Sequence, residues 1–343
     1  MKIPNGVVYS LKGKKLTKQE INFFKNTNPF GFILFSRNFQ NRRQIQELIH
    51  NLKNITQNKN IQISVDQEGG KVQRFDNEDF FEYSSQNKFG SIYRKNPKTA
   101  KKIAYYFSYL NGYELKNIGI DINYSPVADI FYDYADIIIG NRAFDSDPKV
   151  VFDLAKEFCK GFKDIGIIPV LKHFPGHGRS TKDTHKDLSI ISSSLDDLKK
   201  SDFIPFKILN NEILVMLAHI IYEQIDSKVA TYSEKIIKNL LRKDFKFRGL
   251  VLSDDISMKA LNGSLQDKVK KSYAGGCDVI LYCKGELNEM IEIDKFVEPI
   301  KKKYFDYFLY HSYRMKEKKL DLKLIEKELF KYKLIKKKNG IKC

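Results

Sequence analysis

Short apolar runs that alternate with helix-patterned segments are the feature that most restricts how this chain can fold. Eight runs of five to seven residues are typical of buried β-strands: Gly6–Ser10, Gly31–Phe35, Ile61–Asp66, Ile120–Pro126, Ile167–His173, Ile213–His219, Gly249–Asp254 and Cys277–Cys283. Helical periodicity marks segments between them: Asn41–Asn54, Lys98–Ile118, Val150–Ile165, Leu195–Asn210 and Ser233–Phe245. Strands that alternate with helices form βαβ units and a parallel sheet. Eight such units predict an α/β fold, a single (β/α)8 TIM-type barrel.

An open, doubly wound sheet is the alternative architecture. That fold usually carries a glycine-rich phosphate loop after its first strand, and none follows Gly6–Ser10. The barrel is also favoured by the polar residues that end or follow five of the runs: Asp66, Asp129, Lys172, His173, His219 and Asp254. Active sites of such barrels form at the carboxyl ends of several strands. We therefore expect these residues to share one end of the barrel.

The last part of the chain differs in character from the rest. From about residue 286 it is dense in lysine and glutamate, and apolar residues recur on one side of a predicted helix near Leu320–Leu329. We predict a catalytic barrel over residues 1–285. Residues 286–343 are predicted to form a lysine-rich, helical C-terminal extension packed on it.

The composition limits the partners and the compartment. The formal net charge is +18, from 60 basic and 42 acidic residues. Such a charge could attract nucleic acid or an anionic membrane, but the lysines are spread along the whole chain, which favours a solvated surface. No run reaches the length of a membrane span or a signal peptide, and the four cysteines form no C-x-x-C pair. We expect a cytoplasmic monomer without nucleic-acid or membrane partners.

The most specific local pattern is a loop with histidines and glycines, from Lys172 to His185. Asp183 precedes His185 by two residues, so its carboxylate could hold one ring nitrogen while the other exchanges protons. A metal site is the alternative for the H-x3-H pair His173 and His177. That spacing indicates zinc on a helix, which the neighbouring proline and glycines disfavour. The pattern therefore favours an acid/base dyad over a metal site.

Two adjacent carboxylates follow an apolar strand at Val251–Met258. A carboxylate at a barrel mouth can attack a sugar carbon or stabilise positive charge, whereas capping of the next helix requires only one aspartate. Asp254 lies nearer the strand end, so we expect it to take the chemical role. Asp255 is expected to be structural.

Two further loops combine glycine with arginine. In Asp66–Phe75 a glycine pair allows a sharp turn that could bring Asp66 close to Arg74. Arg142 lies on another loop, within Gly140–Phe144. An aspartate and an arginine together can bind vicinal hydroxyls, since one accepts and the other donates hydrogen bonds. Either pattern alone also fits an ordinary loop salt bridge.

Five stretches, in this order, closely resemble family 3 glycoside hydrolases, and within them the single-domain bacterial β-N-acetylhexosaminidases of cell-wall recycling. The stretches are DQEGGKVQRF (66–75), GNRAF (140–144), LKHFPGHGRSTKDTHKDL (171–188), VMLAHIIY (215–222) and VLSDDISM (251–258). The resemblance covers roughly residues 1–285 and implies a TIM barrel with a two-step retaining mechanism. It also implies that no cofactor is needed.

The resemblance implies roles for particular residues. Asp254 matches the nucleophile, His185 the acid/base, and Asp183 its partner. The sugar-binding residues are matched by Asp66, Arg74, Arg142, Lys172 and His173. The implied substrate is a small carbohydrate, N-acetylglucosamine linked to 1,6-anhydro-N-acetylmuramic acid, with or without peptide. A phosphorylase that uses the same covalent intermediate is the alternative, because a neutral histidine repels phosphate less than a carboxylate would.

Overall fold

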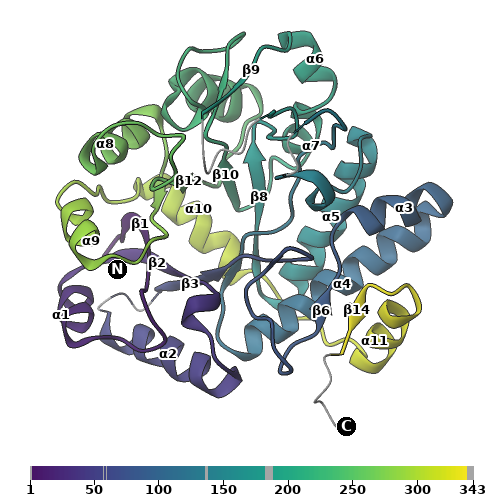
Figure 1. The fold of residues 1–343 in the computed structure, drawn as a ribbon, viewed down its shortest axis with the longest axis horizontal. Helices are drawn as coiled ribbons and strands as arrows, with labels where there is room; N and C mark the ends of the chain where they lie inside the picture. Colours follow the sequence, from purple (N-terminus) through teal and green to yellow (C-terminus); the bar gives the residue numbers. More distant parts are fainter. Residues whose placement is uncertain (1, 57, 59, 136–137, 182–187, 338–343) are drawn as a thin grey trace.

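A closed barrel of parallel strands forms the centre of the molecule (Figure 1). The structure, a computed structural model, describes residues 2–56, 58, 60–135, 138–181 and 188–337. Eight strands follow one another around the barrel in chain order: β1 (Asn5–Ser10), β2 (Pro29–Leu34), β3 (Gln62–Val65), β7 (Ile122–Asn123), β8 (Ile168–Phe174), β10 (Leu214–Leu217), β12 (Leu250–Asp255) and β13 (Val279–Leu281). The predicted TIM-type barrel is confirmed.

Helices surround this barrel. They are α1 (Lys18–Asn26), α2 (Arg42–Ile55), α3 (Asn87–Lys95), α4 (Pro97–Asn117), α5 (Pro148–Ile165), α6 (Leu195–Lys200), α7 (Phe203–Ile208), the π-helix η4 (Lys235–Asp244), α8 (Leu265–Gly275), α9 (Leu287–Asp294), α10 (Lys302–Tyr313) and α11 (Leu322–Lys331). Of these, α2, α4, α5, η4 and α11 lie where the periodicity predicts helices. Side-chain caps begin several of the helices: Thr17 closes a capping box on α1, and Asn41 caps α2.

One predicted helix is wrong in its extent. The segment Leu195–Asn210 forms two short helices, α6 and α7, instead of one. Pro205 lies in the first turn of α7, and Ser201, four residues earlier, ends α6. A proline ring clashes with the carbonyl group four residues before it and removes one helical hydrogen bond. A continuous helix through this point is therefore disfavoured.

The barrel strands have apolar side chains on both faces. In β1, Val7 and Tyr9 pack in the cluster that joins strands to helices, whereas Val8 packs with residues from the other strands around the barrel. Successive side chains of a strand point to opposite faces, so the second cluster fills the interior. This interior packing makes the barrel a solid support for residues at its ends.

Helix α10 closes the amino-terminal end of the barrel. Phe305 and Phe308 belong to the interior cluster, and the rings of Phe308 and Phe30 lie 5.1 Å apart between centroids. The N–H group of Ile300 donates to the carbonyl of Pro4, just before β1. Residues after 285 therefore pack directly on the barrel. The division of the chain at residue 285 stays a prediction.

Shorter strands pair with one another outside the barrel. β4 (Gln67–Gly69) pairs with β5 (Val72–Gln73), and β9 (Ser189–Ile191) pairs with β11 (Ile220–Tyr222). β14 (Ile335–Lys336) pairs with β6 (Glu82–Tyr83), which fastens the segment that contains α11 beside α4 (Figure 1). Within the described ranges no helix has both the length and the apolar character needed to cross a lipid bilayer.

Candidate active site

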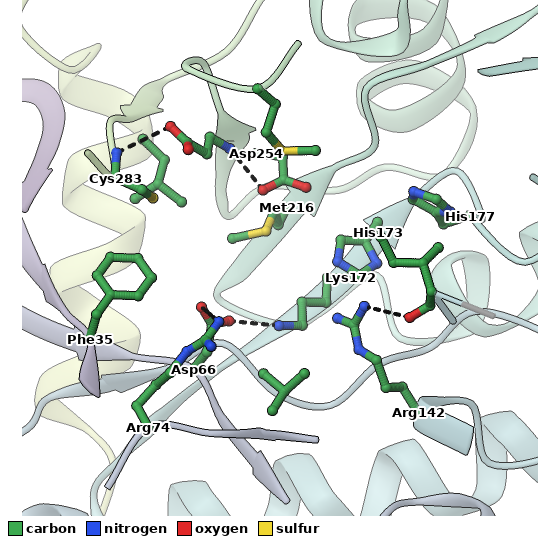
Figure 2. A pocket seen from close by; sticks show the side chains of 15 residues that line it. Phe35, Asp66, Arg74, Arg142, Lys172, His173, His177, Met216, Asp254 and Cys283 are labelled. Carbon is green, nitrogen blue, oxygen red and sulfur yellow. Dashed lines mark hydrogen bonds and ion pairs between the residues drawn. The ribbon is translucent and has the colours of Figure 1, made fainter. Parts of the chain in front are cut away.

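A cavity of about 260 Å³ opens at the carboxyl end of the barrel, where the predicted site residues gather (Figure 2). Six of the predicted site residues line it: Asp66, Arg74, Arg142, Lys172, His173 and Asp254. They come from β3 and the hairpin after it, from the short helix η2 (Gly140–Arg142), from β8 and from β12. The expectation that polar residues from different strands meet at one end of the barrel is confirmed.

Asp66 lies between two cations at one side of this cavity. Its Oδ1 atom is 2.8 Å from Nζ of Lys172, and its Oδ2 atom is 3.5 Å from Nη2 of Arg74. The turn between β4 and β5 that brings Arg74 back contains Gly69 and Gly70, both with positive φ angles of 104° and 61°. The predicted approach of Asp66 to Arg74 through the glycine pair is confirmed.

Glu68 extends this arrangement, although the sequence did not mark it as a site residue. One of its oxygens lies 2.5 Å from Nζ of Lys172, and both oxygens accept hydrogen bonds from Arg142, at 2.8 and 3.0 Å. Charges of alternating sign therefore run from Arg74 through Asp66, Lys172 and Glu68 to Arg142. Opposite charges in contact in this way offset much of the cost of burying them.

The carboxyl group of Glu68 stays ionised in this position. Burial alone would raise its pKa, but the charges and hydrogen bonds of Arg142 and Lys172 lower it more. The pKa of Glu68 therefore lies well below its usual range. In the sequence, Glu68 is marked only by its position two residues after Asp66, which equally suits an exposed turn residue.

Asp129 fixes a second part of the site, and it was expected at this end of the barrel but not as a site residue. Its fully buried carboxylate accepts hydrogen bonds from the backbone N–H groups of His173 and His177, at 3.0 and 2.7 Å, and lies 2.7 Å from Nδ1 of His173. Nδ1 of His173 therefore faces Asp129, and the ring is held in one orientation at the cavity wall.

The charge state around Asp129 follows from burial and from these contacts. Burial would raise the pKa of Asp129, but His173 and His177 lower it below its usual range. Burial, with the neighbouring His173, lowers the pKa of His177 to about 4. His177 is thus neutral near pH 7 and adds no charge to the cavity.

Asp254 and Asp255 end β12 with different surroundings. Asp255 accepts hydrogen bonds from the backbone and the hydroxyl of Ser257, at 3.0 and 2.5 Å, and from the backbone of Cys283 at 3.1 Å. Asp254 accepts the N–H group of Asp255 at 2.7 Å and lies across the cavity from Asp66 and Arg74 (Figure 2). Asp255 thus has the contacts expected of a structural residue. The chemical role of Asp254 stays a prediction.

Two predicted residues, Asp183 and His185, lie outside the described residues. Their placement relative to Asp254 therefore stays a prediction. The sequence analysis did not single out the apolar and sulfur-containing residues of the cavity wall as site residues: Phe35, Val72, Ile138, Met216, Met258, Leu281 and Cys283. Among the described residues, no group of three or more histidine, cysteine, aspartate and glutamate side chains has the arrangement of a metal site.

Gly178 allows a close approach of two backbone segments beside the site. A Cβ atom at this position would lie 1.8 Å from the carbonyl oxygen of Ile130, next to Asp129. We expect Gly178→Ala to lower the free energy of unfolding by about 1–3 kcal/mol, because one segment must shift. Activity should fall as well, since His173 is held by the displaced segment.

Chemical denaturation and kcat/KM measure the two effects of Gly178→Ala. Gly13→Ala is the matched control, because a Cβ atom there would lie 3.9 Å from its nearest neighbour. We expect this control to match the wild type in both measurements. Wild-type stability and activity in Gly178→Ala would show that the two segments separate at little cost.

Comparison with known proteins identifies the family. A model of the glycosyl hydrolase family 3 N-terminal domain matches residues 6–304. A β-hexosaminidase of Stenotrophomonas maltophilia is 36% identical over 285 residues, which cover 82% of this chain and 84% of the relative. One of Bordetella avium is 34% identical over 284 residues, which cover 82% of this chain and 81% of the relative.

A solved structure agrees over nearly the whole chain. The crystal structure of NagZ from Neisseria gonorrhoeae in complex with N-trifluoroacetyl-D-glucosamine has a TM-score of 0.83 and 32% sequence identity, with 96% of each chain covered. The family match extends beyond residue 285 and includes the start of α10. The chain therefore belongs to glycosyl hydrolase family 3 and is a glycoside hydrolase.

Proposed function

We propose that the protein is a retaining exo-β-N-acetylglucosaminidase. It removes terminal, non-reducing β-1,4-linked N-acetylglucosamine from peptidoglycan fragments through a covalent glycosyl intermediate on Asp254. The natural substrate is N-acetylglucosamine linked to 1,6-anhydro-N-acetylmuramic acid, with or without a peptide, and the reaction belongs to cell-wall recycling in the cytoplasm. The protein acts as a monomer and needs no cofactor.

The arrangement of charges across the cavity carries this proposal. Arg74, Asp66 and Lys172 present donors and acceptors on one side, and the Asp254 carboxylate lies across from them (Figure 2). Fixed donors and acceptors suit the hydroxyl groups of a sugar ring. A carboxylate opposite them suits the anomeric carbon, where positive charge develops as the glycosidic bond breaks.

The reaction proceeds in two displacements. Asp254 attacks the anomeric carbon while His185, protonated, donates its proton to the glycosidic oxygen, and the leaving sugar departs. Neutral His185 then takes a proton from water, which displaces Asp254, and the two inversions retain the β-configuration. An imidazole has an ordinary pKa of about 6.5, so it can act as acid and base near neutral pH. Asp183 orients the ring and stabilises its charged form.

The relatives support the substrate class. The two relatives are named β-hexosaminidases. The similar structure from Neisseria gonorrhoeae is a complex with N-trifluoroacetyl-D-glucosamine, an N-acylated glucosamine. Both charged and apolar residues line the cavity of about 260 Å³, and this mixed lining suits the hydroxyl groups and the acyl group of such a sugar. For this chain, the same class of sugar is the proposed ligand.

Hydrolysis of two chromogenic substrates tests the proposal. We expect the 4-nitrophenyl β-N-acetylglucosaminide to be cleaved with a kcat/KM about 10²-fold or more above that of the β-glucoside, because a site built for a polar group rejects a substrate without it. Release of nitrophenolate measures both rates. Equal rates, or preference for the glucoside, would contradict the proposed specificity.

The nature of the product separates hydrolysis from phosphorolysis. In phosphate buffer a hydrolase yields free N-acetylglucosamine, whereas a phosphorylase yields the sugar 1-phosphate. We expect only the free sugar. Accumulation of the 1-phosphate would identify inorganic phosphate as the acceptor and assign the chain to the alternative activity.

A further inference from the structure

Glu68 contacts two cavity-lining cations but does not itself line the cavity. Its side chain is 1% exposed, and its oxygens lie within 3.0 Å of Lys172 and Arg142. Lys172 and Arg142 line the cavity, whereas Glu68 is not among the lining residues. Glu68 therefore lies behind the sugar-facing groups and is placed to act through them.

Local structure gives Glu68 this position. Asp66 and Glu68 flank Lys172, at 2.8 and 2.5 Å from its Nζ atom. Gln67, between them, uses its side chain elsewhere: its Oε1 atom accepts the N–H groups of Arg74 and Phe75, at 2.8 and 3.1 Å. Alternate side chains of an extended segment point to opposite sides. One face of the segment thus holds the cations and the other fastens the hairpin.

Glu68 also restricts the donors that the cations can offer to a ligand. Arg142 has five N–H groups; two point to Glu68 and a third, on Nη1, to the carbonyl of Ile138. Lys172 has three N–H groups, and its Nζ atom contacts both Asp66 and Glu68. The remaining donors, two on Arg142 and one on Lys172, are thereby fixed in direction.

Removal of Glu68 would leave Lys172 and Arg142 without their shared partner. Lys172 is 2% exposed and Arg142 13% exposed, so little water reaches either charge. Two cations in a region of low dielectric repel each other strongly. They would then separate or turn toward Asp66, and their donors would leave the directions that a sugar requires.

We propose that Glu68 is a positioning residue, which sets the direction of the Lys172 and Arg142 donors that bind the terminal sugar. This inference rests on the proposed function, since it assumes a sugar in the cavity. Glu68 neither transfers a proton nor touches the substrate. Its removal therefore lowers kcat/KM by the same factor for every substrate with the same terminal sugar, whatever the leaving group.

Glu68→Gln tests the proposal, because it keeps the size of the side chain and removes its charge. We expect kcat/KM for β-N-acetylglucosaminides to fall about 10²-fold, the cost typical of misplaced binding groups. The factor should be equal for an aryl and a sugar leaving group, and azide should not restore turnover. Isothermal titration with N-acetylglucosamine should show weaker binding, independently of turnover.

Glu212→Gln is the matched control. Glu212 is another buried glutamate, and its carboxylate contacts Nζ of Lys163 at 2.7 Å, before β10 at the opposite end of the barrel. We expect this variant to keep kcat/KM within about twofold of the wild type, whereas both variants lose some stability from a broken ion pair. A similar fall in kcat/KM in both variants would mean that Glu68 is merely structural.

A double-mutant cycle with Arg142→Lys separates positioning from general damage. If Glu68 acts through Arg142, the loss in the double variant is smaller than the product of the two single losses. Losses that multiply would overturn the proposal. If Glu68→Gln does not fold, Glu68→Asp serves as the second variant. It keeps the charge, but its side chain is one methylene too short to reach both cations. It should lose about tenfold in kcat/KM, and wild-type activity in either variant would overturn the proposal.

The same measurements separate this inference from the proposed function. A wild-type protein that does not cleave β-N-acetylglucosaminides would contradict the function itself. A wild type that cleaves them, together with an unimpaired Glu68→Gln variant, would contradict only the role of Glu68.

Discussion

Asp254→Ala is expected to remove nearly all turnover while the protein still folds. Asp254 ends β12 at the cavity wall, across from Asp66 and Arg74. In the proposed mechanism this carboxylate forms the covalent intermediate. Its loss should therefore raise the activation free energy by several kcal/mol, and each ~1.4 kcal/mol is a factor of ten in rate. Steady-state kinetics on the chromogenic β-N-acetylglucosaminide measures the loss.

The folding control for this prediction is thermal unfolding followed by circular dichroism. Asp254 is partly exposed at the cavity, so its replacement leaves the interior packing intact, and we expect a melting temperature close to that of the wild type. More than about a tenth of wild-type activity, a change of only ~1.4 kcal/mol, would show that another carboxylate is the nucleophile. Asp255 would then be the next candidate, despite its hydrogen bonds to Ser257 and Cys283.

His185→Ala is expected to impair substrates unequally. A nitrophenolate leaves without protonation, so the first step should slow little for an aryl substrate. A sugar leaving group needs the proton, and its departure should slow by about 10²–10⁴-fold, the usual size of general acid catalysis. The second step should be slow for both substrates, because water is no longer activated. Pre-steady-state and steady-state rates on both substrates measure these effects.

Addition of azide tests whether His185 acts as the general base in the second step. Azide attacks the glycosyl intermediate without a general base, so it should restore turnover of the aryl substrate and yield the β-glycosyl azide. Asp183→Ala should show a milder form of the same behaviour, because the imidazole remains but loses its orientation and its charge partner. An equal loss of rate on both substrates, with no turnover restored by azide, would mean that His185 has only a structural role.

Glu68→Gln and His185→Ala should therefore differ in kind. In the Glu68 variant, kcat/KM is expected to fall by the same factor on every substrate, and azide should not restore turnover. In the His185 variant, the loss of rate should depend on the leaving group, and azide should restore turnover of the aryl substrate. Both patterns can be measured with the same two substrates, so one set of assays distinguishes a residue that positions the sugar from one that transfers a proton.

The sequence by itself determined the barrel and the end of it that carries the site. Strand-like runs with polar residues at their carboxyl ends are local patterns, and parallel strands of a barrel present those ends together. The gathering of Asp66, Lys172, His173 and Asp254 around one cavity follows from that rule. The glycine pair at Gly69 likewise indicated that Arg74 returns to Asp66, because a sharp turn is a property of neighbouring residues.

Only the tertiary structure decided which residues hold the site in shape. Glu68 and Asp129 looked like ordinary acidic residues near strand ends, and their functional contacts are with Lys172, Arg142 and His173, far away in the chain. The closure of the barrel by Phe308 of α10 against Phe30 was hidden for the same reason. Local propensity and periodicity depend on neighbours in sequence, whereas the partner of a buried charge or ring depends on how distant segments pack.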